Sequence, residues 1–413
     1  MAIIFYVAFP AAFGFVSNGR LQAFFQYANT AAVWFAVATI LLLAGGGKKA
    51  LTAIVPAIAL LLTKSVSVIC LFCLVLLYLL FSSPLPKRKK VLFASIALLA
   101  GCIVLFVLGP SRISEASQTF IERAIQWHDG LKSLVGSPLF GIGPGAWRYE
   151  YLHVQSAQYT ARVIHNGYLQ VGLDAGILTL LLFCVWIVRG LIGLARTASS
   201  NQEARFVFCA AMLLALHLFL DIDLAFGVID LLLGVLMTFG VAQGFHWKQS
   251  KLHKRLFGLS AGLFALACAS LCLIAFVRML PQTNPPSGIF STDPELRCNY
   301  ANELCENEEF EPAIAFIEEK TIANTTDLLV LEAGARYCLG NRDGGEKLLL
   351  ELVSAEPFNF KLYDLSSLYF RRYGVSDSGA SRFEELELEA NARLSQYPAA
   401  LLANQEYLSY EVG

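Results

Sequence analysis

The sequence is poor in charged residues. Only 15% of its 413 residues are Asp, Glu, Lys or Arg and 56% are hydrophobic, whereas soluble globular chains carry roughly 25% charged residues. This composition excludes a purely soluble protein. The formal net charge is -1, so the chain lacks the excess of positive charge that attracts nucleic acid, and we expect no nucleic-acid partner.

The sequence also lacks the motifs of common nucleotide and metal sites. The glycines at 141, 143 and 145 are followed by no Lys-Ser/Thr pair and preceded by no strand pattern, which excludes a Walker-type phosphate loop and a dinucleotide fingerprint. No cluster of histidine, cysteine and carboxylate residues has the spacing of a metal site. Asp221 and Asp223 do not share a helix face, so we interpret them as a polar hinge or cavity lining. We interpret His217, one turn earlier, as a residue that satisfies Asp221 rather than as a proton relay.

The ten cysteines do not form a disulfide scaffold. Seven lie in apolar runs, where a thiol is usually a small packing group, and these include the redox-like spacing of Cys70 and Cys73. Only Cys298, Cys305 and Cys338 lie in the polar C-terminal region. That odd number permits at most one disulfide there.

Long apolar runs dominate the first 280 residues and predict an all-α, polytopic membrane helix bundle, because a membrane-spanning helix needs roughly 20 apolar residues. Met1 leads into the first run without a basic segment or a cleavage site, so we expect a span rather than a cleaved signal peptide. We predict about nine spans, at residues 2–17, 28–46, 50–63, 66–83, 91–109, 168–188, 206–224, 226–246 and 256–279.

Short basic clusters predict the orientation of these spans. Lys48 and Lys49 precede the stretch 50–83 and residues 87–90 follow it, so a hairpin of two short helices keeps both clusters on one face. Arg189, Arg196 and Arg205 fall on the same face. Because cytoplasmic loops carry the excess of Lys and Arg, we place the N-terminus in the cytoplasm. Three segments then face outward: residues 17–27, the loop 110–166, and everything after 279.

The C-terminal region has the composition of a water-soluble domain. A linker at 281–292 separates the membrane region 1–280 from residues 293–413, for which we predict an extracytoplasmic helical-repeat domain. Residues 301–307 align with 335–341 at a spacing of 34, which is the period of tetratricopeptide-like helix pairs. A generic helical bundle is the alternative. Stacked repeats present concave surfaces to protein or glycan partners.

The outward loop 110–166 carries the first candidate for a reactive residue, because long ordered loops are often functional. His165 lies where this loop re-enters the membrane, and an imidazole takes a proton near neutral pH, which would activate a sugar hydroxyl. The alternative is an ordinary interfacial histidine. Arg20, Lys64 and Arg123 also lie on the predicted outer face, against the positive-inside tendency. They are candidates for binding an anionic ligand, with lipid headgroup contact as the alternative.

Taken together, these segments resemble the O-antigen ligase and polymerase superfamily over roughly residues 15–245. The resemblance depends on three segments: Arg123 with Trp127, the glycine-rich turn, and the His-Asn-x-Tyr-Leu-Gln motif that begins at His165 and leads to Asp174-Ala-Gly-Ile. The segment 20–29, with its arginine, aromatic residues and asparagine, is similar to an earlier family motif. The combination is more specific than any single piece.

The resemblance implies a multi-pass glycosyltransferase at the outer face of the bacterial cytoplasmic membrane, surrounded by membrane lipid. Its donor would be an undecaprenyl-diphosphate-linked oligosaccharide, its acceptor a hydroxyl of a glycan or another molecule, and it would need no metal and no cofactor. By resemblance, His165 acts on the acceptor hydroxyl and Arg123 holds the diphosphate. The remaining expected substrate contacts are Arg20, Lys64, Asn166, Tyr168 and Trp127.

The sequence departs from the family pattern at three places. The hairpin turn has Lys64 but lacks the arginine that members often carry two residues later, and Asp174 replaces the usual glutamate. Members commonly have further spans before the segment that begins at Arg20, so we expect a short form, a mis-assigned start or an impaired enzyme. The missing spans and the missing arginine favour a non-catalytic scaffold of a surface-polysaccharide system whose repeat domain recruits protein partners. The intact Arg123, glycine turn and His165 favour the enzyme.

Overall fold

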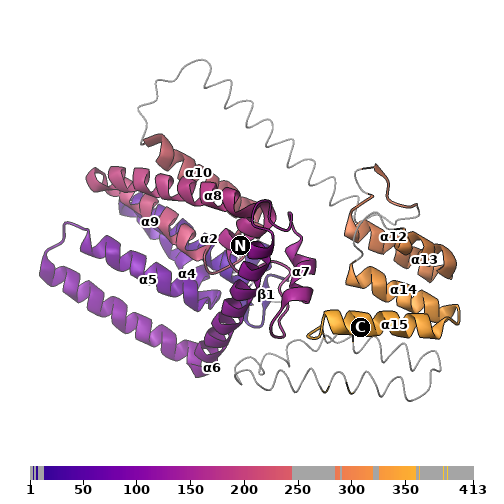
Figure 1. Ribbon diagram of the computed structural model, residues 1–413. Coiled ribbons are helices and arrows are strands. Elements are labelled where there is room, and N and C mark those ends of the chain that lie inside the picture. Colours follow the sequence, from indigo (N-terminus) through magenta and orange to yellow (C-terminus); the bar gives the residue numbers. More distant parts are fainter. Residues whose placement is uncertain are drawn as a thin grey trace. The chain divides into compact units, whose positions relative to one another are not determined.

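A computed structural model describes residues 3, 6–7, 14–243, 284–288, 291–319, 325–359, 362, 385 and 388. This part of the chain is mostly helical, which confirms the all-α prediction. It forms two compact units, and each is described by itself (Figure 1). The first holds the elements from β1 to α10 except residues 152–158, which belong with α12 to α15 to the second.

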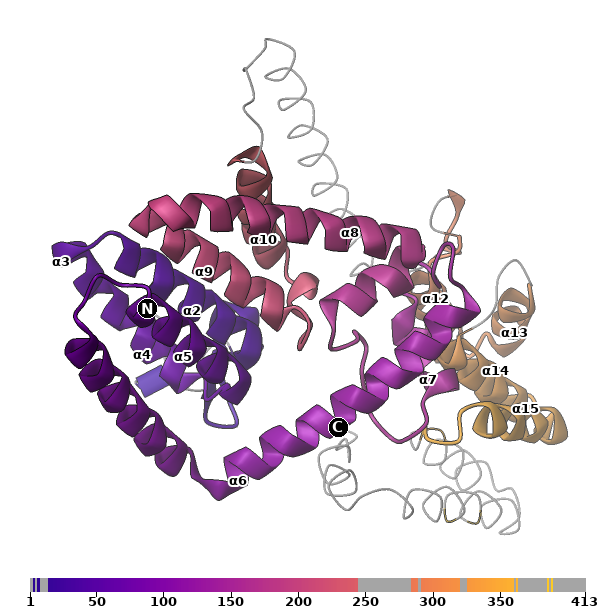
Figure 2. The same ribbon diagram turned by 60° about the vertical axis from the view of Figure 1, so that its left-hand side comes forward.

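The first unit is built around the apolar helix α2. This helix packs against α9, α4 and α5, and α8 packs against both α9 and α10 (Figure 2). Ala31, Ala32 and Ala36 are fully buried, so their small side chains let neighbouring helices approach closely. The elements are the β1–β2 hairpin (Val16–Ser17 and Arg20–Leu21), η2 (Ala23–Phe25), α2 (Ala28–Ala44), α3 (Gly47–Ala50), η3 (Leu51–Ala53), α4 (Ile54–Leu62), α5 (Val66–Phe81), α6 (Lys87–Gly136), α7 (Trp147–Val154), α8 (Gly167–Ser200), α9 (Gln202–His217), η4 (Asp223–Ala225) and α10 (Gly227–Gln243).

The stretch 50–83 is two helices rather than one. α4 ends at Leu62 and α5 begins at Val66, and Lys64 adopts a left-handed backbone conformation (φ 52°) in the turn between them. The sequence predicted this break from the basic clusters on either side. The turn brings the Lys64 ammonium to 3.4 Å from the position that a Cβ on Gly19 would occupy.

The expected loop 110–166 is largely helical. α6 is 50 residues long and runs unbroken from Lys87 to Gly136, so it continues the predicted span 91–109 well into that segment. The ribbon of α6 bends partway along its length (Figure 2), and proline, which the sequence has at position 110, is a usual cause of such bends. The helix therefore carries Arg123 and Trp127 on a regular scaffold.

Glycines join α8 to α10 by direct backbone contact. A Cβ on Gly193 would lie 1.8 Å from the carbonyl oxygen of Gly240, and a Cβ on Gly240 would lie 2.1 Å from that of Gly190. Real Cβ atoms do not approach so closely, so only glycine fits at this crossing. The two helices are thereby locked at one point along their length.

One described helix, α8, is long and apolar enough to cross a membrane. Leu178, Leu181 and Leu182 on α8 are exposed, as expected for side chains that face lipid. Shorter apolar helices cover 28–44, 51–62, 66–81 and 227–242. The nine spans therefore stay a prediction, and most of 2–17 and all of 256–279 lie outside the described residues.

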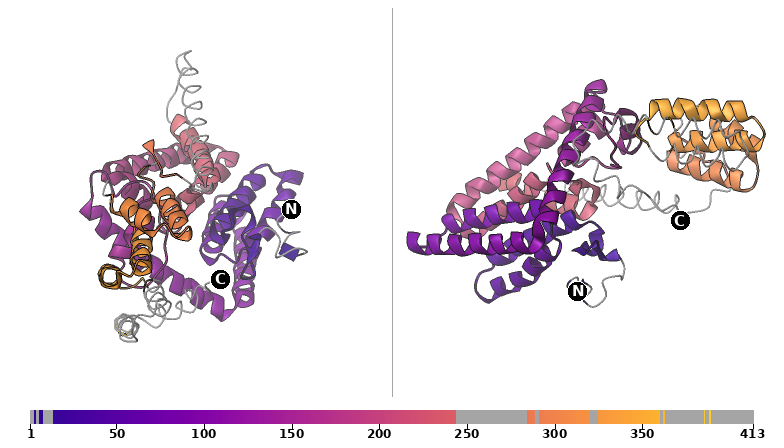
Figure 3. Two further views of the ribbon diagram at one scale, coloured as in Figure 1. Left: turned by 90° about the vertical axis from the view of Figure 1, so that its right-hand side faces the viewer. Right: turned by 90° about the horizontal axis from the view of Figure 1, so that it is seen from below.

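In the described part of the second unit, helices α12 to α15 form a stack, coloured orange to yellow in Figure 3. Each helix contacts the next along the chain, and α12 also contacts α14. Ala301 and Ala335, which the 34-residue alignment pairs, are both buried. The helices are α12 (Pro294–Glu306), α13 (Phe310–Glu318), α14 (Thr326–Cys338) and α15 (Arg342–Ala355). Assignment to the tetratricopeptide class stays a prediction, and most of the chain after 359 lies outside the described residues.

Candidate functional site

The centre of the candidate site is the carboxylate of Asp221, which is completely buried. Its Oδ1 accepts hydrogen bonds from the Tyr27 hydroxyl at 2.7 Å and the Ile222 amide at 2.9 Å. Its Oδ2 accepts from Asn29 Nδ2 and Arg123 Nη2, each at 2.8 Å. Four donors therefore stabilise the ionised carboxylate and fix its orientation, as a buried charge requires.

Asp221 belongs to a turn between α9 and α10, and Asp223 lies in the same turn. The Oδ1 of Asp223 accepts from the Thr30 hydroxyl at 2.8 Å, and its Oδ2 lies 2.6 Å from Nδ1 of His217. We expected His217 to satisfy Asp221, but its short contact is to Asp223 and its Nε2 lies 3.9 Å from Asp221. Asp223 is the nearer partner because the chain leaves the helix after His217, so helical spacing no longer decides which acid is reached.

Arg20 reaches this network through Asn29. The Nη2 of Arg20 donates to Asn29 Oδ1 at 2.8 Å, and its Nε donates to the carbonyl of Thr63 at 3.0 Å. Ser65 also donates to Asn29 Oδ1, at 2.9 Å. These bonds tie the β2 strand, the start of α2 and the turn around Lys64 together. Arg20 and Arg123 thus lie on either side of the hydrogen-bonded pair Asn29 and Asp221.

Arg123 pairs with a carboxylate inside the protein, and one of its N–H groups has no hydrogen-bond partner among the described residues. Its side chain is 8% exposed and pairs with Asp221 through Nη2. Its Nε is buried and has no hydrogen-bond partner among the described residues. A buried guanidinium N–H without a partner is costly, so it marks a position where an anionic group would gain a strong hydrogen bond.

His165 lies beside these charges, in the segment that precedes α8. Its carbonyl accepts a hydrogen bond from Trp127 Nε1 at 2.8 Å, and its ring Nδ1 lies 2.9 Å from Gln126 Oε1. Burial is the main cause that lowers the pKa of His165 to about 4. The positive charge of Arg123 lowers this pKa further, and the negative charge of Asp221 partly offsets both effects. The ring is therefore neutral near pH 7, the state in which an imidazole accepts a proton.

Three further predicted substrate contacts have internal partners. Asn166 caps α8 by accepting from the Leu169 amide at 3.0 Å. The Tyr168 hydroxyl donates to the carbonyl of Ala215 at 2.9 Å. Trp127 lies edge-on to two phenylalanines, with ring centroids 6.0 Å from Phe120 and 5.2 Å from Phe219. These bonds give each residue a structural role, and their contact with substrate stays a prediction.

The glycine-rich turn fits against a kink in α8. Gly141 has φ 68°, and a Cβ there would lie 2.2 Å from the carbonyl oxygen of Leu173. Gly176 has φ 85°, interrupts the helical geometry of α8, and approaches Leu139 in the same way. Asp174 accepts from the Gly145 amide at 3.0 Å. The turn thus clamps the first part of α8, the helix that begins two residues after His165.

Two residues of this network went unrecognised in the sequence. The sequence marks Asp221 only as part of an acidic pair, and no local signal connects it to Arg123, which lies 98 residues away. Gln126 has such a signal: it lies one helical turn after Arg123 and next to Trp127 on α6. Helical spacing therefore predicts that Gln126 shares a face with Arg123.

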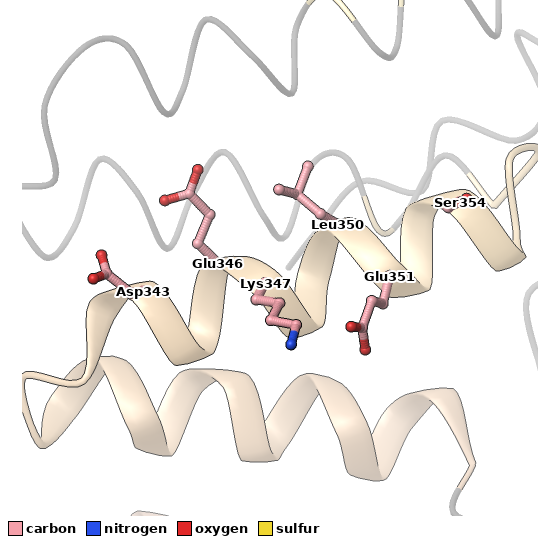
Figure 4. Close-up of a pocket in the computed structure, with 6 residues that line it drawn as sticks. All are labelled: Asp343, Glu346, Lys347, Leu350, Glu351 and Ser354. Carbon is pink, nitrogen blue, oxygen red and sulfur yellow. The ribbon is translucent and has the colours of Figure 1, made fainter.

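Two surface hollows contain no residue of this network. One lies on α15, where acidic side chains and one lysine project from the helix (Figure 4). It is lined by Asp343, Glu346, Lys347, Leu350, Glu351 and Ser354. The other is lined by Tyr78, Ser82, Ala195, Ala198, Ser199, Arg205 and Phe208. Within the described ranges, no three histidine, cysteine or carboxylate side chains come together as metal ligands would.

A family model supports the resemblance seen in the sequence. Residues 51–184 match the model described as O-antigen ligase. The matched segment includes Arg123, the glycine-rich turn and His165, and it ends before Asp221. No curated protein matches the chain. The match supports a relationship to O-antigen ligases and a role in glycan transfer during polysaccharide biosynthesis.

Proposed function

We propose that the protein transfers or polymerises a lipid-linked glycan, carried on undecaprenyl diphosphate, onto an acceptor hydroxyl at the outer face of the cytoplasmic membrane. The family match supports glycan transfer and a membrane setting, and the exposed apolar side chains of α8 agree with that setting. One observation carries the proposal: a neutral His165 lies beside Arg123, whose buried Nε has no partner among the described residues.

In the proposed reaction, Nε2 of His165 accepts the proton of the acceptor hydroxyl, while the oxygen of that hydroxyl attacks the anomeric carbon of the donor sugar. The bond between that carbon and the diphosphate oxygen breaks, and the lipid diphosphate leaves with the electron pair. Arg123 stabilises the negative charge that develops on the leaving group. The proton on His165 then passes to solvent, which returns the ring to its neutral state.

Asp221 serves this reaction indirectly. A carboxylate repels a diphosphate, so Asp221 would not bind the donor itself. Its 2.8 Å ion pair with Arg123 instead fixes the guanidinium, and its bond to Asn29 connects it to Arg20. Arg20 is the second cation of the proposed diphosphate site, and Lys64, in the turn that Arg20 contacts through Thr63, is a third.

One observation favours the scaffold alternative. Arg20 and Arg123 both have internal hydrogen-bond partners, and buried ion pairs of this kind also occur in sites that only maintain structure. If the network is structural, replacing His165 leaves glycan transfer intact as long as the protein folds. The two functions therefore make opposite predictions for conservative variants.

The test is complementation of a deletion strain, with polymer or conjugate measured on gels and the protein quantified in membranes. We expect His165→Asn and Arg123→Lys to reduce product by about 100-fold or more, because a general base or a charge clamp contributes that much. The matched controls are His128→Asn on α6 and Arg196→Ala on α8, both exposed residues outside the network; these should retain product. Full product from both site variants would establish the scaffold instead.

A further inference from the structure

Gln126 links a carboxylate to the ring of His165. Its side chain is completely buried on α6. Its Nε2 donates to Glu122 Oε1 at 3.0 Å, one turn earlier on the helix, and its Oε1 lies 2.9 Å from Nδ1 of His165. The three side chains form a continuous chain of hydrogen bonds from Glu122 to the imidazole.

The chemistry of these groups fixes the direction of every bond. An ionised carboxylate only accepts hydrogen bonds, so the amide must turn its NH₂ group toward Glu122. The amide oxygen of Gln126 then faces His165, and an amide oxygen is also only an acceptor. Nδ1 of His165 must therefore carry a hydrogen. In the neutral ring the other nitrogen, Nε2, is left without one.

We propose that Glu122 and Gln126 are positioning residues that hold neutral His165 in the tautomer with hydrogen on Nδ1, so that Nε2 is free to accept the proton of the acceptor hydroxyl. This inference rests on the proposed function, in which His165 is the base. Among the described residues, Nε2 of His165 has no hydrogen-bond partner.

The surroundings of His165 hold the ring in the same place. Trp127, next to Gln126 on α6, donates to the carbonyl of His165. A Cβ on Gly130, one turn further along, would lie 2.4 Å from Cδ1 of Ile164 and 3.1 Å from Leu169. α6 therefore packs tightly against residues on both sides of His165. Gln126 and Trp127 then orient the ring and the backbone from one rigid helix.

The charged groups that face the ring are Arg123 on α6 and Asp221 in the turn after α9, together with Glu122 through Gln126. Arg123 and Asp221 oppose each other, and burial favours the neutral ring. The neutral amide of Gln126 selects a tautomer without adding a charge. A carboxylate at the same place would also accept from Nδ1, but it would stabilise the protonated ring.

The direct test is nitrogen NMR of the full chain in nanodiscs with ¹⁵N-labelled histidine, since the two tautomers give distinct ring signals. The signal of His165 is assigned by its loss in His165→Asn. We expect the Nδ1–H form in the wild type and a mixture of forms in Gln126→Leu. Glu122→Gln is the milder variant, because it removes the obligate acceptor with little change in volume, and it should also give a mixture. An Nε2–H form in the wild type overturns the proposal.

The second test is the pH profile of transfer. Gln126→Glu should keep the tautomer but move the acidic limb upward by about one to three pH units, because an adjacent opposite charge favours the protonated ring. Gln126→Leu should reduce kcat about tenfold or more at constant pH, with a smaller change in KM. The control is Gln118→Leu, two turns earlier on α6, which makes none of these bonds and should match the wild type. An unmoved profile in Gln126→Glu contradicts the proposal.

The two ideas fail in different ways. If His165→Asn transfers glycan normally, then His165 is not the base and the proposed function loses its mechanism, whatever the NMR shows. If His165 is essential but its ring carries hydrogen on Nε2, the positioning role of Gln126 alone is wrong. The NMR readout does not depend on glycan transfer, so it tests the hydrogen-bond chain separately.

Discussion

Arg123 and Asp221 form a 2.8 Å ion pair between side chains that are 8% and 0% exposed and lie 98 residues apart in the sequence. The pair connects α6 to the turn between α9 and α10. Because α6 also contacts His165 through Gln126 and Trp127, one helix holds both the proposed base and the proposed cation, and the ion pair fixes the guanidinium of that cation. Its contribution to stability and its contribution to activity are separable by mutation.

The first prediction concerns this ion pair. Arg123→Ala or Asp221→Ala alone should each lower the free energy of unfolding by about 3–5 kcal/mol, because each leaves a buried charge unpaired. The double variant should cost much less than the sum of the two. Denaturant titration of the purified protein in detergent measures all three values. Additive costs would show that the two charges are not coupled.

The second prediction concerns the glycine-rich turn. Gly141→Ala should destabilise the protein much more than Gly145→Ala. Both glycines have positive φ, but a Cβ at 141 would also lie 2.2 Å from a backbone oxygen, whereas one at 145 has open space. The positive φ alone costs about 1–2 kcal/mol. Thermal unfolding of the two variants compares them under one condition, and equal destabilisation would mean that the turn does not clamp α8.

The third prediction separates capping from substrate binding at Asn166. Asn166→Ala should cost about 1 kcal/mol of stability, because the side chain accepts from the Leu169 amide at the start of α8. Asn166→Asp should retain most of that stability but raise the KM for donor, because Asn166 is a predicted substrate contact and the added carboxylate repels a diphosphate. The control is Asn201→Ala, which removes the equivalent cap of α9. An unchanged KM in Asn166→Asp would limit the residue to capping α8.

The fourth prediction concerns stability against pH. His165 binds a proton at a pKa of about 4 in the folded protein and near its ordinary value of 6.5 when unfolded. Between these values the unfolded chain binds more protons, so the contribution of His165 to stability is complete above pH 6.5 and is lost as the pH falls toward 4. His165→Asn should therefore flatten the pH dependence of unfolding in this window. An unchanged slope would mean that the ring is not buried in its neutral form.

Local patterns in the sequence predicted local structure well. The basic clusters around 50–83 indicated the break that the structure places at Lys64, and the spacing of glycines indicated a turn rather than a phosphate loop. Such features depend on residues that are close in sequence. The loop 110–166 was predicted less well, because its first part is polar by composition yet continues as helix α6 to Gly136.

The buried network could not be predicted in the same way. The spacing of an α-helix indicates that Asp221 and Asp223 do not share a face, but Asp221 lies in a turn after α9 and Asp223 begins the 3-10 helix η4, where that rule does not apply. Asp221 accepts hydrogen bonds from Asn29 on α2 and Arg123 on α6. Arg20 on β2 is connected to it through Asn29, and only the folded chain brings these residues together. The sequence indicated the cations Arg20, Lys64 and Arg123. The structure adds Asp221, which orients Arg123 directly and Arg20 through Asn29.

The glycine crossing of α8 and α10 has a consequence for protein engineering. α8 begins next to His165, and α10 begins shortly after Asp221. Gly193 and Gly240 hold the two helices in contact near their C-terminal ends. Neither glycine belongs to the proposed site. A library that varies only the neighbours of His165 would leave this glycine contact unchanged. One added methyl group at Gly193 would push α8 and α10 apart and change the distance between His165 and Asp221, although Gly193 is remote from both in the sequence.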